Sequence, residues 1–273
     1  QVVFCEDGSN DRSYEKLKII KELWPNVKII KLTRNFGQIP AIYASLSKIK
    51  SKAYIIMSAD LQDPVELIND FLFFHFKEGF NIVGGERESR KDSFISTIGS
   101  KLFYKLLSKL SFPNYPLGGF DFVLISNKVR NLILEMNQSD PFIQGEILFT
   151  GFDSKFIPYN REKRISGKSQ WSLSKKIKYF IDAIMGYSFF PLRIMSFFGI
   201  ILFLCSISFL IYIIISKIYG LGNMPYGWAS LMVIILFLGG IQMIFLGILG
   251  EYLWRVLSQV RNKPHYVIEK IIE

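Results

Sequence analysis

The chain has 273 residues and a formal net charge of +10; 50% of its residues are hydrophobic and its mean hydropathy is +0.26. This balance is too apolar for an ordinary soluble domain, although 21% of the residues are charged. The two properties are segregated, because charged and apolar residues mix only as far as about Arg193. The composition therefore excludes a single soluble domain and predicts a globular part followed by a membrane part.

Apolar, β-rich runs alternate with helical patterns in the first 170 residues. The predicted strands are Val2–Cys5, Val27–Leu32, Ala53–Met57, Asn81–Gly84, Asp121–Ile125 and Lys155–Pro158. The predicted helices are Ser13–Leu23, Gln38–Ile49, Val65–Lys77, Phe94–Leu110 and Lys128–Met136. Strands that alternate with helices predict βαβ units and a largely parallel sheet. We therefore expect residues 1–170 to form one α/β domain.

The sequence opens inside a strand pattern, at Gln1–Phe4, with no initiating Met and no strand before it. A parallel sheet that began there would lack the partner that usually precedes the first βα unit. We therefore expect that the N-terminus is truncated.

Polar residues follow the first two predicted strands. Glu6 and Asp7 come after the first strand, where carboxylates can accept hydrogen bonds from a base or a ribose hydroxyl. The alternative for this segment is the start of a helix, with Ser9 or Asp11 as its N-cap. Arg34 follows the second strand and brings a cation to the same edge of the sheet, which suits a nucleotide or its phosphates.

The third predicted strand ends in the segment Ser58-Ala-Asp-Leu-Gln-Asp-Pro64. Its oxygen ligands, above all Asp60 and Gln62, suit Mg²⁺ or Mn²⁺, and those metals commonly bridge protein carboxylates to substrate phosphates. The alternative is a strand-to-helix turn, with Asp63 as N-cap and Pro64 at the first helical position.

Residues 171–192 have an amphipathic pattern. Apolar residues recur there at helical spacing, with lysines on the remaining face: Leu173, Ile177, Phe180, Ile181 and Ile184. The pattern predicts an amphipathic helix that lies in a membrane interface. The alternative is a solvated charged face on a packing helix.

Two charge-free spans, 194–216 and 218–250, follow and are divided only by Lys217. Each exceeds the roughly 20 residues needed to cross a bilayer core; the alternative is a pair of buried core helices. Basic residues flank the pair on both outer sides: Lys175, Lys176, Lys178, Arg193, Arg255, Arg261 and Lys263. The positive-inside rule then places both ends in the cytoplasm. We expect a transmembrane hairpin in 193–256, with spans near 194–216 and 228–250, and a cytoplasmic tail over 257–273.

Together these elements resemble the family-2 glycosyltransferases of the GT-A fold. More narrowly, the chain is similar to the polyprenyl-phosphate glycosyltransferases, which include dolichol-phosphate mannose synthases and bacterial undecaprenyl-phosphate glucosyltransferases. The matching blocks are Glu6–Ser9, Arg34–Gly37, Ala59–Pro64, Gly118–Phe122, Arg161–Trp171 and the C-terminal hairpin. The resemblance implies a Rossmann-like, mostly parallel sheet with flanking helices, followed by the interface helix and the two membrane helices.

The resemblance also implies roles for residues at the donor site. Asp60 matches the aspartate that binds the metal and the diphosphate, with Gln62 as a further metal contact. Glu6 and Asp7 match the pair that holds the nucleotide, and Arg34 joins them as a nucleotide-binding residue.

Further residues match the acceptor and diphosphate sites of the family. Arg87 matches a basic position that meets the acceptor phosphate, and Asp121 matches an aspartate that orients or deprotonates the acceptor. Arg161, Arg164 and Lys168 lie in a segment that closes over the donor diphosphate.

The sequence departs from the family pattern at three places. Ser58 replaces the first acid of the Asp-x-Asp element, so a metal must rely on Asp60, Gln62 and the substrate phosphates. The block around Asp121 continues as Phe122-Val123 and lacks the usual Arg. The family's first strand and its Pro-x-Tyr-Asn-Glu segment are absent, a loss that can leave the chain as given inactive.

The implied activity is metal-dependent, inverting transfer of a sugar from a nucleotide sugar to undecaprenyl phosphate, for a cell-envelope glycan or lipid modification. A UDP-sugar is the favoured donor and a GDP-sugar the second, with Mg²⁺ or Mn²⁺ as cofactor. We expect a multi-pass protein of the inner membrane with a cytoplasmic catalytic domain, a homo-oligomer such as a tetramer, a separate flippase, and no nucleic-acid partner.

Two other functions are alternatives to this activity. A non-catalytic scaffold or accessory protein of the same fold is supported only by Ser58 and the missing start. A processive polysaccharide synthase would need a Gln-x-x-Arg-Trp segment and more membrane spans, and the sequence contains neither.

Overall fold

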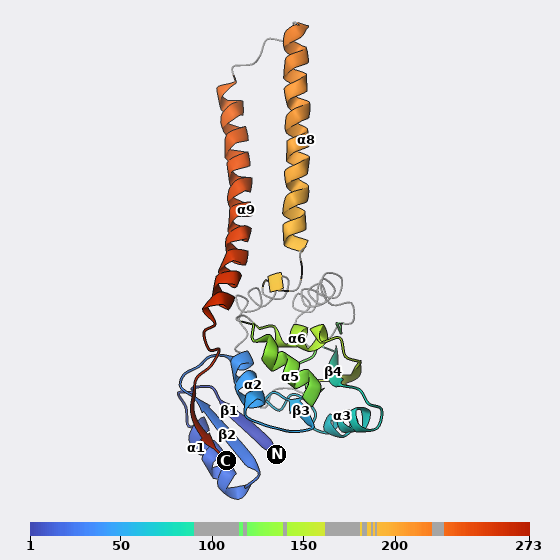
Figure 1. The fold of residues 1–273 in the computed structure, drawn as a ribbon, viewed down its shortest axis with the longest axis vertical. Coiled ribbons are helices and arrows are strands. Elements are labelled where there is room, and N and C mark those ends of the chain that lie inside the picture. The colour runs from blue at the N-terminus through green and yellow to red at the C-terminus, as the bar shows by residue number, and fades with distance from the viewer. Residues whose placement is uncertain are drawn as a thin grey trace.

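The computed structural model describes residues 1–89, 115–116, 119–138, 141–161, 181, 185–186, 188, 190–219 and 227–273. An α/β part carries two long helices that extend away from it (Figure 1).

The elements follow the predicted order closely. They are β1 (Val2–Glu6), α1 (Ser13–Leu23), β2 (Val27–Leu32), α2 (Gln38–Ser47), β3 (Ala53–Ile56), α3 (Leu67–Phe76), β4 (Ile82–Ser89), β5 (Val123–Ser126), α5 (Asn127–Met136), α6 (Ile143–Phe149), β6 (Ser154–Asn160), α8 (Phe190–Ile218), α9 (Trp228–Arg261) and β7 (Ile268–Ile272). All six predicted strands are present; β2 has the predicted bounds, and the other five have shifted ends. The predicted helix Phe94–Leu110 lies outside the described residues.

The strands form two mixed sheets, in the orders β1-β2-β7 and β3-β5-β4-β6. Two pairings are parallel, β1 with β2 and β4 with β6. Three pairings are antiparallel, namely β2 with β7, β3 with β5, and β4 with β5. The α/β class is confirmed, but both sheets are mixed, whereas a mostly parallel sheet was predicted. Alternation of helices and strands left the direction of β5 undetermined, since a long connection separates it from β4.

The predicted C-terminal tail contains a strand. In β7, Ile271 and Ile272 pair with Ile30 and Ile29 of β2. Two ion pairs flank this pairing, at 2.8 Å between Lys31 and Glu269 and at 2.5 Å between Lys28 and Glu273. The chain therefore returns from α9 to the first sheet. The sequence analysis missed this strand because it is short and carries two charged residues.

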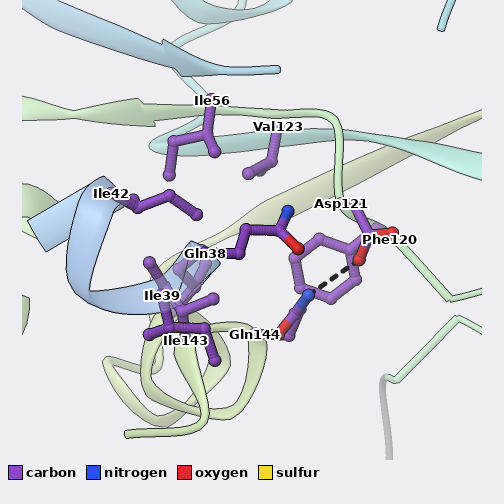
Figure 2. Close-up of a pocket in the computed structure, with 10 residues that line it drawn as sticks. Gln38, Ile39, Ile42, Ile56, Phe120, Asp121, Val123, Ile143 and Gln144 are labelled. Carbon is purple, nitrogen blue, oxygen red and sulfur yellow. Dashed lines mark hydrogen bonds between the residues drawn. The ribbon is translucent and has the colours of Figure 1, made fainter. Parts of the chain in front are cut away.

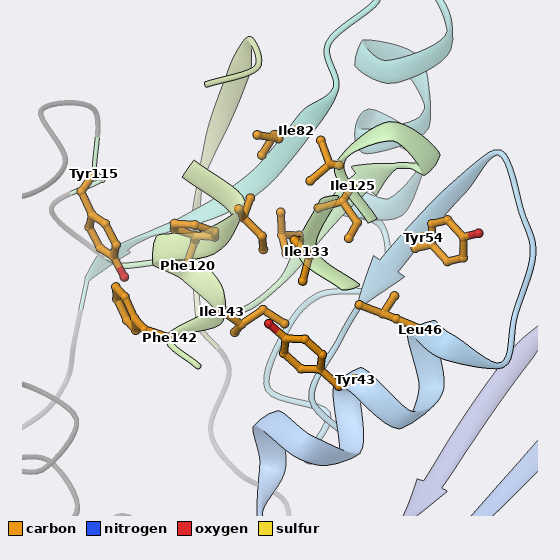
Figure 3. Close-up of a cluster of buried hydrophobic side chains, with 13 residues drawn as sticks. Tyr43, Leu46, Tyr54, Ile82, Tyr115, Phe120, Ile125, Ile133, Phe142 and Ile143 are labelled. Atoms are coloured by element: carbon orange, nitrogen blue, oxygen red, sulfur yellow. The ribbon is translucent and has the colours of Figure 1, made fainter. Parts of the chain in front are cut away.

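The second sheet is buried on both faces. Phe122 and Leu124 project toward α3 and pack with Phe71, while Val123 and Ile125 project to the other face. There they join side chains from α2, α5 and α6 (Figure 3). These five residues are at most 2% exposed. Because full burial of such a side chain stabilises by about 1.5–3 kcal/mol, the two layers fix the position of β5 and of the residues just before it.

Helices α8 and α9 run side by side away from the α/β part (Figure 1), with few contacts between their described residues. Of the helix residues described, one stretch, Phe237–Arg261, is by length and composition able to cross a membrane. It is not buried within the protein. Two long helices thus lie where the hairpin was predicted, while the crossing of a membrane by either helix and the predicted topology stay predictions.

The C-terminal end of α9 contacts the end of α5. Asn137 and Asn262 follow the two helices in the left-handed conformation, and their side-chain amides are hydrogen-bonded at 3.2 Å. Gln259 donates to the Asn137 carbonyl at 3.1 Å, and the His265 Nε2 lies 3.0 Å from the Asn137 Oδ1. The α/β part is therefore attached to α9 by side-chain contacts as well as by the chain.

Candidate active site

Asp7 lies directly after β1 and braces the loop that follows β2. Its Oδ1 accepts a hydrogen bond from the Phe36 N–H at 2.7 Å, and its Oδ2 accepts one from the Gly37 N–H at 2.8 Å. The loops also touch at Gly8, whose φ is +64° and where a Cβ would collide with the backbone of Arg34. Because hydrogen bonds to an ionised carboxylate are strong, Asp7 holds the two loops in register.

Glu6 is bonded in a similar way, while Arg34 is not. Glu6 is 4% exposed and accepts a hydrogen bond from the Ser9 N–H. Arg34 is exposed, and its guanidinium lies 4.1 Å above the ring of Phe36. The structure thus brings the three predicted nucleotide-binding residues together, with both carboxylates bonded to backbone N–H groups. Their contact with a nucleotide stays a prediction.

Asp60 lies in the loop that leads from β3 to α3. Its Oδ1 is 3.4 Å from the Gln62 N–H, which donates to it, and its Oδ2 is 3.5 Å from Nη2 of Arg161. Leu61, which lies between Asp60 and Gln62, has a φ of 53°, an uncommon conformation for a non-glycine residue. The backbone at Leu61 therefore turns sharply between the two predicted metal ligands.

The oxygen donors of this loop suit a hard divalent cation. Among the residues that the structure describes, no group of three or more His, Cys, Asp or Glu side chains could hold a metal ion. Asp60 and Gln62 supply one carboxylate and one amide. Mg²⁺ keeps several waters and is often held by one or two carboxylates and by substrate phosphates. The residues present fit a metal of this kind that arrives with a diphosphate.

Asp63 closes the same loop and is 2% exposed. Its Oδ1 accepts a hydrogen bond from the Tyr159 hydroxyl at 2.6 Å and lies 3.9 Å from Nε of Arg161. Burial, and then the hydrogen bond to Asp63, raise the pKa of Tyr159 above its ordinary value, so the hydroxyl keeps its proton. The alternative interpretation of Asp63 as a helix N-cap does not hold, because α3 begins at Leu67.

Asp121 precedes β5 and is held by two side chains. Arg87 of β4 forms an ion pair with its Oδ2, and the Gln144 side chain of α6 donates to its Oδ1 at 2.8 Å. Burial alone would raise the pKa of Asp121, but the charge and the hydrogen bond of Arg87 outweigh it, with help from Arg161 and Gln144. The pKa of Asp121 is therefore lowered, which makes this carboxylate a weak proton acceptor.

A pocket lies beside Asp121, between α2, α6 and the second sheet. Its walls are mostly aliphatic, whereas the polar ends of Gln38, Asp121 and Gln144 gather on one side (Figure 2). Gln38 follows the loop that Asp7 holds. The pocket thus lies between Gln38, at the start of α2, and Asp121, which pairs with Arg87.

Glu146 of α6 lies deeper in the core and is 0% exposed. The Tyr43 hydroxyl of α2 donates a hydrogen bond to its Oε2, while its Oε1 has no partner among the described residues. Burial raises the pKa of Glu146 to about 8. Glu146 therefore links the two helices that wall the pocket, largely in its neutral form at pH 7.

Sequence reasoning found some of these residues and missed others. Arg164, Lys168 and most of the predicted helix 171–192 lie outside the described residues. Gln144 and Tyr159 were missed because their contacts, with Asp121 and Asp63, join segments far apart in the chain. Asp63 was included in the matching block Ala59–Pro64 and considered as an N-cap, but its contacts with Tyr159 and Arg161 were not predicted.

Comparison with known proteins shows the family. The family model described as "Glycosyl transferase family 2" matches residues 1–132. The SfII prophage-derived bactoprenol glucosyl transferase of Shigella flexneri is 35% identical over 273 residues, which cover 99% of this chain and 87% of that protein. The chain belongs to glycosyl transferase family 2.

Two further similarities concern this glycosyltransferase. A glycosyltransferase of Synechocystis sp., described as uncharacterized, is 34% identical over 272 residues, or 99% of this chain and 85% of that protein. The glucosyl-3-phosphoglycerate synthase of Mycobacterium tuberculosis, solved with Mn²⁺, UDP-glucose and phosphoglyceric acid, has a TM-score of 0.46 at 16% identity. That similarity covers 67% of this chain and 66% of the solved chain.

Proposed function

We propose that this glycosyltransferase moves a sugar from a nucleotide sugar, a UDP-sugar before a GDP-sugar, to a polyprenyl phosphate. The observation that carries the proposal is the pair of arginines, Arg87 and Arg161, which contact acidic side chains at the ends of the second-sheet strands. Both substrates carry phosphate, and arginine binds phosphate oxygens through its planar fork of donors. The bactoprenol glucosyl transferases among the relatives support a polyprenyl acceptor.

The donor is expected to bind with its diphosphate near Asp60. Asp60 and Gln62 would hold Mg²⁺ or Mn²⁺, which when bound stabilises the charge that develops on the leaving diphosphate. Arg161 lies next to Asp60 and supplies a second positive charge there. Glu6, Asp7 and Arg34 are proposed to place the nucleotide, since Asp7 fixes the loop that carries Phe36 and Gly37. Arg164 and Lys168 are proposed to contact the diphosphate as well.

The acceptor phosphate is proposed to meet Arg87. A phosphate oxygen is already anionic, so it can attack the anomeric carbon of the sugar without a strong base. One displacement forms the new C–O bond, breaks the bond to the diphosphate and inverts the anomeric configuration. The lowered pKa of Asp121 suits this scheme, because the carboxylate then orients Arg87 and removes no proton. Correct placement of the two reactants supplies most of the catalysis.

The acceptor is a lipid, and the long helices are proposed to bring the site to it. We propose that α8 and α9 form the two spans of a hairpin in the inner membrane, with 171–192 in the interface and the catalytic domain in the cytoplasm. The apolar stretch Phe237–Arg261 supports the second span. Assembly into a homo-oligomer, for example a tetramer, and transport of the product by a separate flippase complete the proposal.

The direct test supplies the full-length protein in detergent with undecaprenyl phosphate, Mn²⁺ and each of a set of UDP- and GDP-sugars. The proposal expects one donor to give a glycosylated lipid phosphate, detected by mass spectrometry. Hydrolysis of the donor without a lipid product, or no product from any donor, would contradict it. Removal of the metal with EDTA should abolish the product, and addition of Mn²⁺ or Mg²⁺ should restore it.

A further inference from the structure

Asp63 is a buried carboxylate to which the proposed reaction gives no role. Its side chain is 0% exposed, whereas that of Asp60, three residues earlier, is 21% exposed. A buried charge is costly unless it is paired and hydrogen-bonded. Asp63 is therefore a buried polar side chain that needs partners within the protein.

The partners of Asp63 come from β6 and the residue that follows it. Tyr159 donates its hydroxyl hydrogen bond to the Oδ1 at 2.6 Å, and Arg161 places its Nε 3.9 Å from the same oxygen. The ring of Tyr159 is in turn fixed by β4, because a Cβ on Gly85 would lie 2.7 Å from its Cε1. Asp63 is thus anchored on one side by a rigid sheet.

Arg161 lies between the two carboxylates of the loop. Its Nη2 is 3.5 Å from the Oδ2 of Asp60, while its Nε is on the side of Asp63. At 29%, the Arg161 side chain is the most exposed of the three. The guanidinium therefore lies between the buried carboxylate of Asp63 and the predicted metal ligand Asp60.

We propose that Asp63 is a positioning residue that holds Arg161 over Asp60, so that the guanidinium meets the donor diphosphate in a fixed orientation. This inference rests on the proposed function, because it assigns the diphosphate to Arg161. Asp63 does not touch the substrate; it acts through Arg161 and is kept in place by Tyr159. A purely structural role would need only the bond that joins the loop to β6, and that bond does not require Arg161.

The first test measures the reactivity of Arg161 and needs no substrate. Hydroxyphenylglyoxal modifies accessible guanidinium groups, and mass spectrometry of the full-length protein reports modification at Arg161. Asp63→Asn should speed modification at Arg161 several-fold, and Tyr159→Phe should do so to a smaller extent. Asp70→Asn, which changes an exposed carboxylate of α3, is the matched control and should leave the rate unchanged. An unchanged rate in folded Asp63→Asn contradicts the proposal.

The second test asks whether Asp63 acts through Arg161. The dissociation constant of UDP-glucose is measured with Mn²⁺ by calorimetry for Asp63→Asn, Arg161→Ala and the double variant. Asp63→Asn should weaken binding by roughly tenfold, which corresponds to about 1.4 kcal/mol. In the Arg161→Ala background, the same change should have almost no effect, because the contact through which it acts is gone. Equal effects in both backgrounds would show that Asp63 is structural.

Two precautions keep the proposal open to refutation. If Asp63→Asn fails to fold, Tyr159→Phe and Gly85→Ala, which displaces the same ring, replace it in both tests, and the same outcomes decide. If wild type does not bind UDP-glucose, that donor is excluded from the proposed function, and the modification rate of Arg161 still decides the role of Asp63.

Discussion

The carboxylates at the two strand-end regions of the α/β part have different bonding partners. After β1, Glu6 and Asp7 accept hydrogen bonds from backbone N–H groups of neighbouring loops. Around the second sheet, Asp60 and Asp121 contact the side chains of Arg161 and Arg87. The first set of bonds fixes loops. The second set joins charges that can exchange partners with an incoming anion or cation.

The two sets of carboxylates therefore differ in function: one set maintains the structure, and the other is available to substrates. A carboxylate bonded to the backbone is needed for the shape of the protein, so its loss should appear mainly in stability and in binding of the donor. A carboxylate paired with an arginine beside a pocket is available to substrates, so its loss should appear mainly in the rate of transfer. The predictions for Asp60, Asp121 and Asp7 each test one side of this comparison, and Glu146, which is bonded to the Tyr43 hydroxyl, belongs to neither side.

The largest effect is expected at Asp60. Asp60→Asn should lower the rate of lipid product formation by roughly 10³-fold, because the loop then has no ionised ligand for the metal. Ser58→Ala is the matched control in the same loop and should lower the rate only slightly. Equal rates for Asp60→Asn and wild type across a Mn²⁺ titration would refute the assignment of the metal site.

A smaller effect is expected at Asp121. Asp121→Asn keeps the bond to Gln144 but removes the charge that orients Arg87, so the rate should fall by about 10²-fold through misplacement of the acceptor. The pH profile of the residual activity should resemble that of wild type. A profile that lost its acidic limb would instead identify Asp121 as the general base.

Asp7 should affect stability first. Asp7→Asn replaces one of two acceptors with an amide N–H₂ that faces a backbone donor, Phe36 or Gly37. We expect the free energy of unfolding to fall by about 1–3 kcal/mol, measured by denaturant titration. Transfer at saturating donor should persist in the folded fraction. A wild-type stability for this variant would show that the loop does not depend on Asp7.

The smallest effect is expected at Glu146, and it depends on pH. Its pKa is about 8 in the folded protein against 4.5 as the reference, so the folded state binds the proton more tightly. Wild type should therefore lose stability as the pH rises from about 4.5 to 8. Glu146→Gln should lack this loss and should therefore gain stability relative to wild type as the pH rises to 8, with no such gain near pH 4. Parallel stability curves for the two proteins would contradict the raised pKa.

Much of the fold could be predicted from the sequence. The strand β2 and the helix α1 have the predicted bounds, since their apolar periodicity is clear and turn residues delimit them. The direction of β5 and the strand β7 could not be predicted. Both depend on contacts between segments far apart in the chain, such as Ile29 with Ile272, and local patterns carry no record of such contacts.

The candidate site was predictable only in part, for the same reason. Asp60, Asp121, Arg87 and Arg161 were identified from their blocks, yet their pairing was not. Arg87 and Asp121 were assigned separate roles, whereas the structure joins them in one ion pair. The side chain of Asp63 is buried and that of Asp60 is partly exposed. The sequence does not reveal this difference, because the two aspartates are only three residues apart in the same loop.

The most direct test of the comparison measures lipid product formation by Asp60→Asn and Asp7→Asn side by side. Both variants are assayed at saturating donor and Mn²⁺, with undecaprenyl phosphate, and the rates are divided by the folded fraction of each preparation. We predict that the rate of Asp60→Asn falls roughly 10³-fold below that of wild type, while Asp7→Asn retains a rate within about tenfold of wild type. The reverse order, with Asp60→Asn active and Asp7→Asn inactive, would contradict the account.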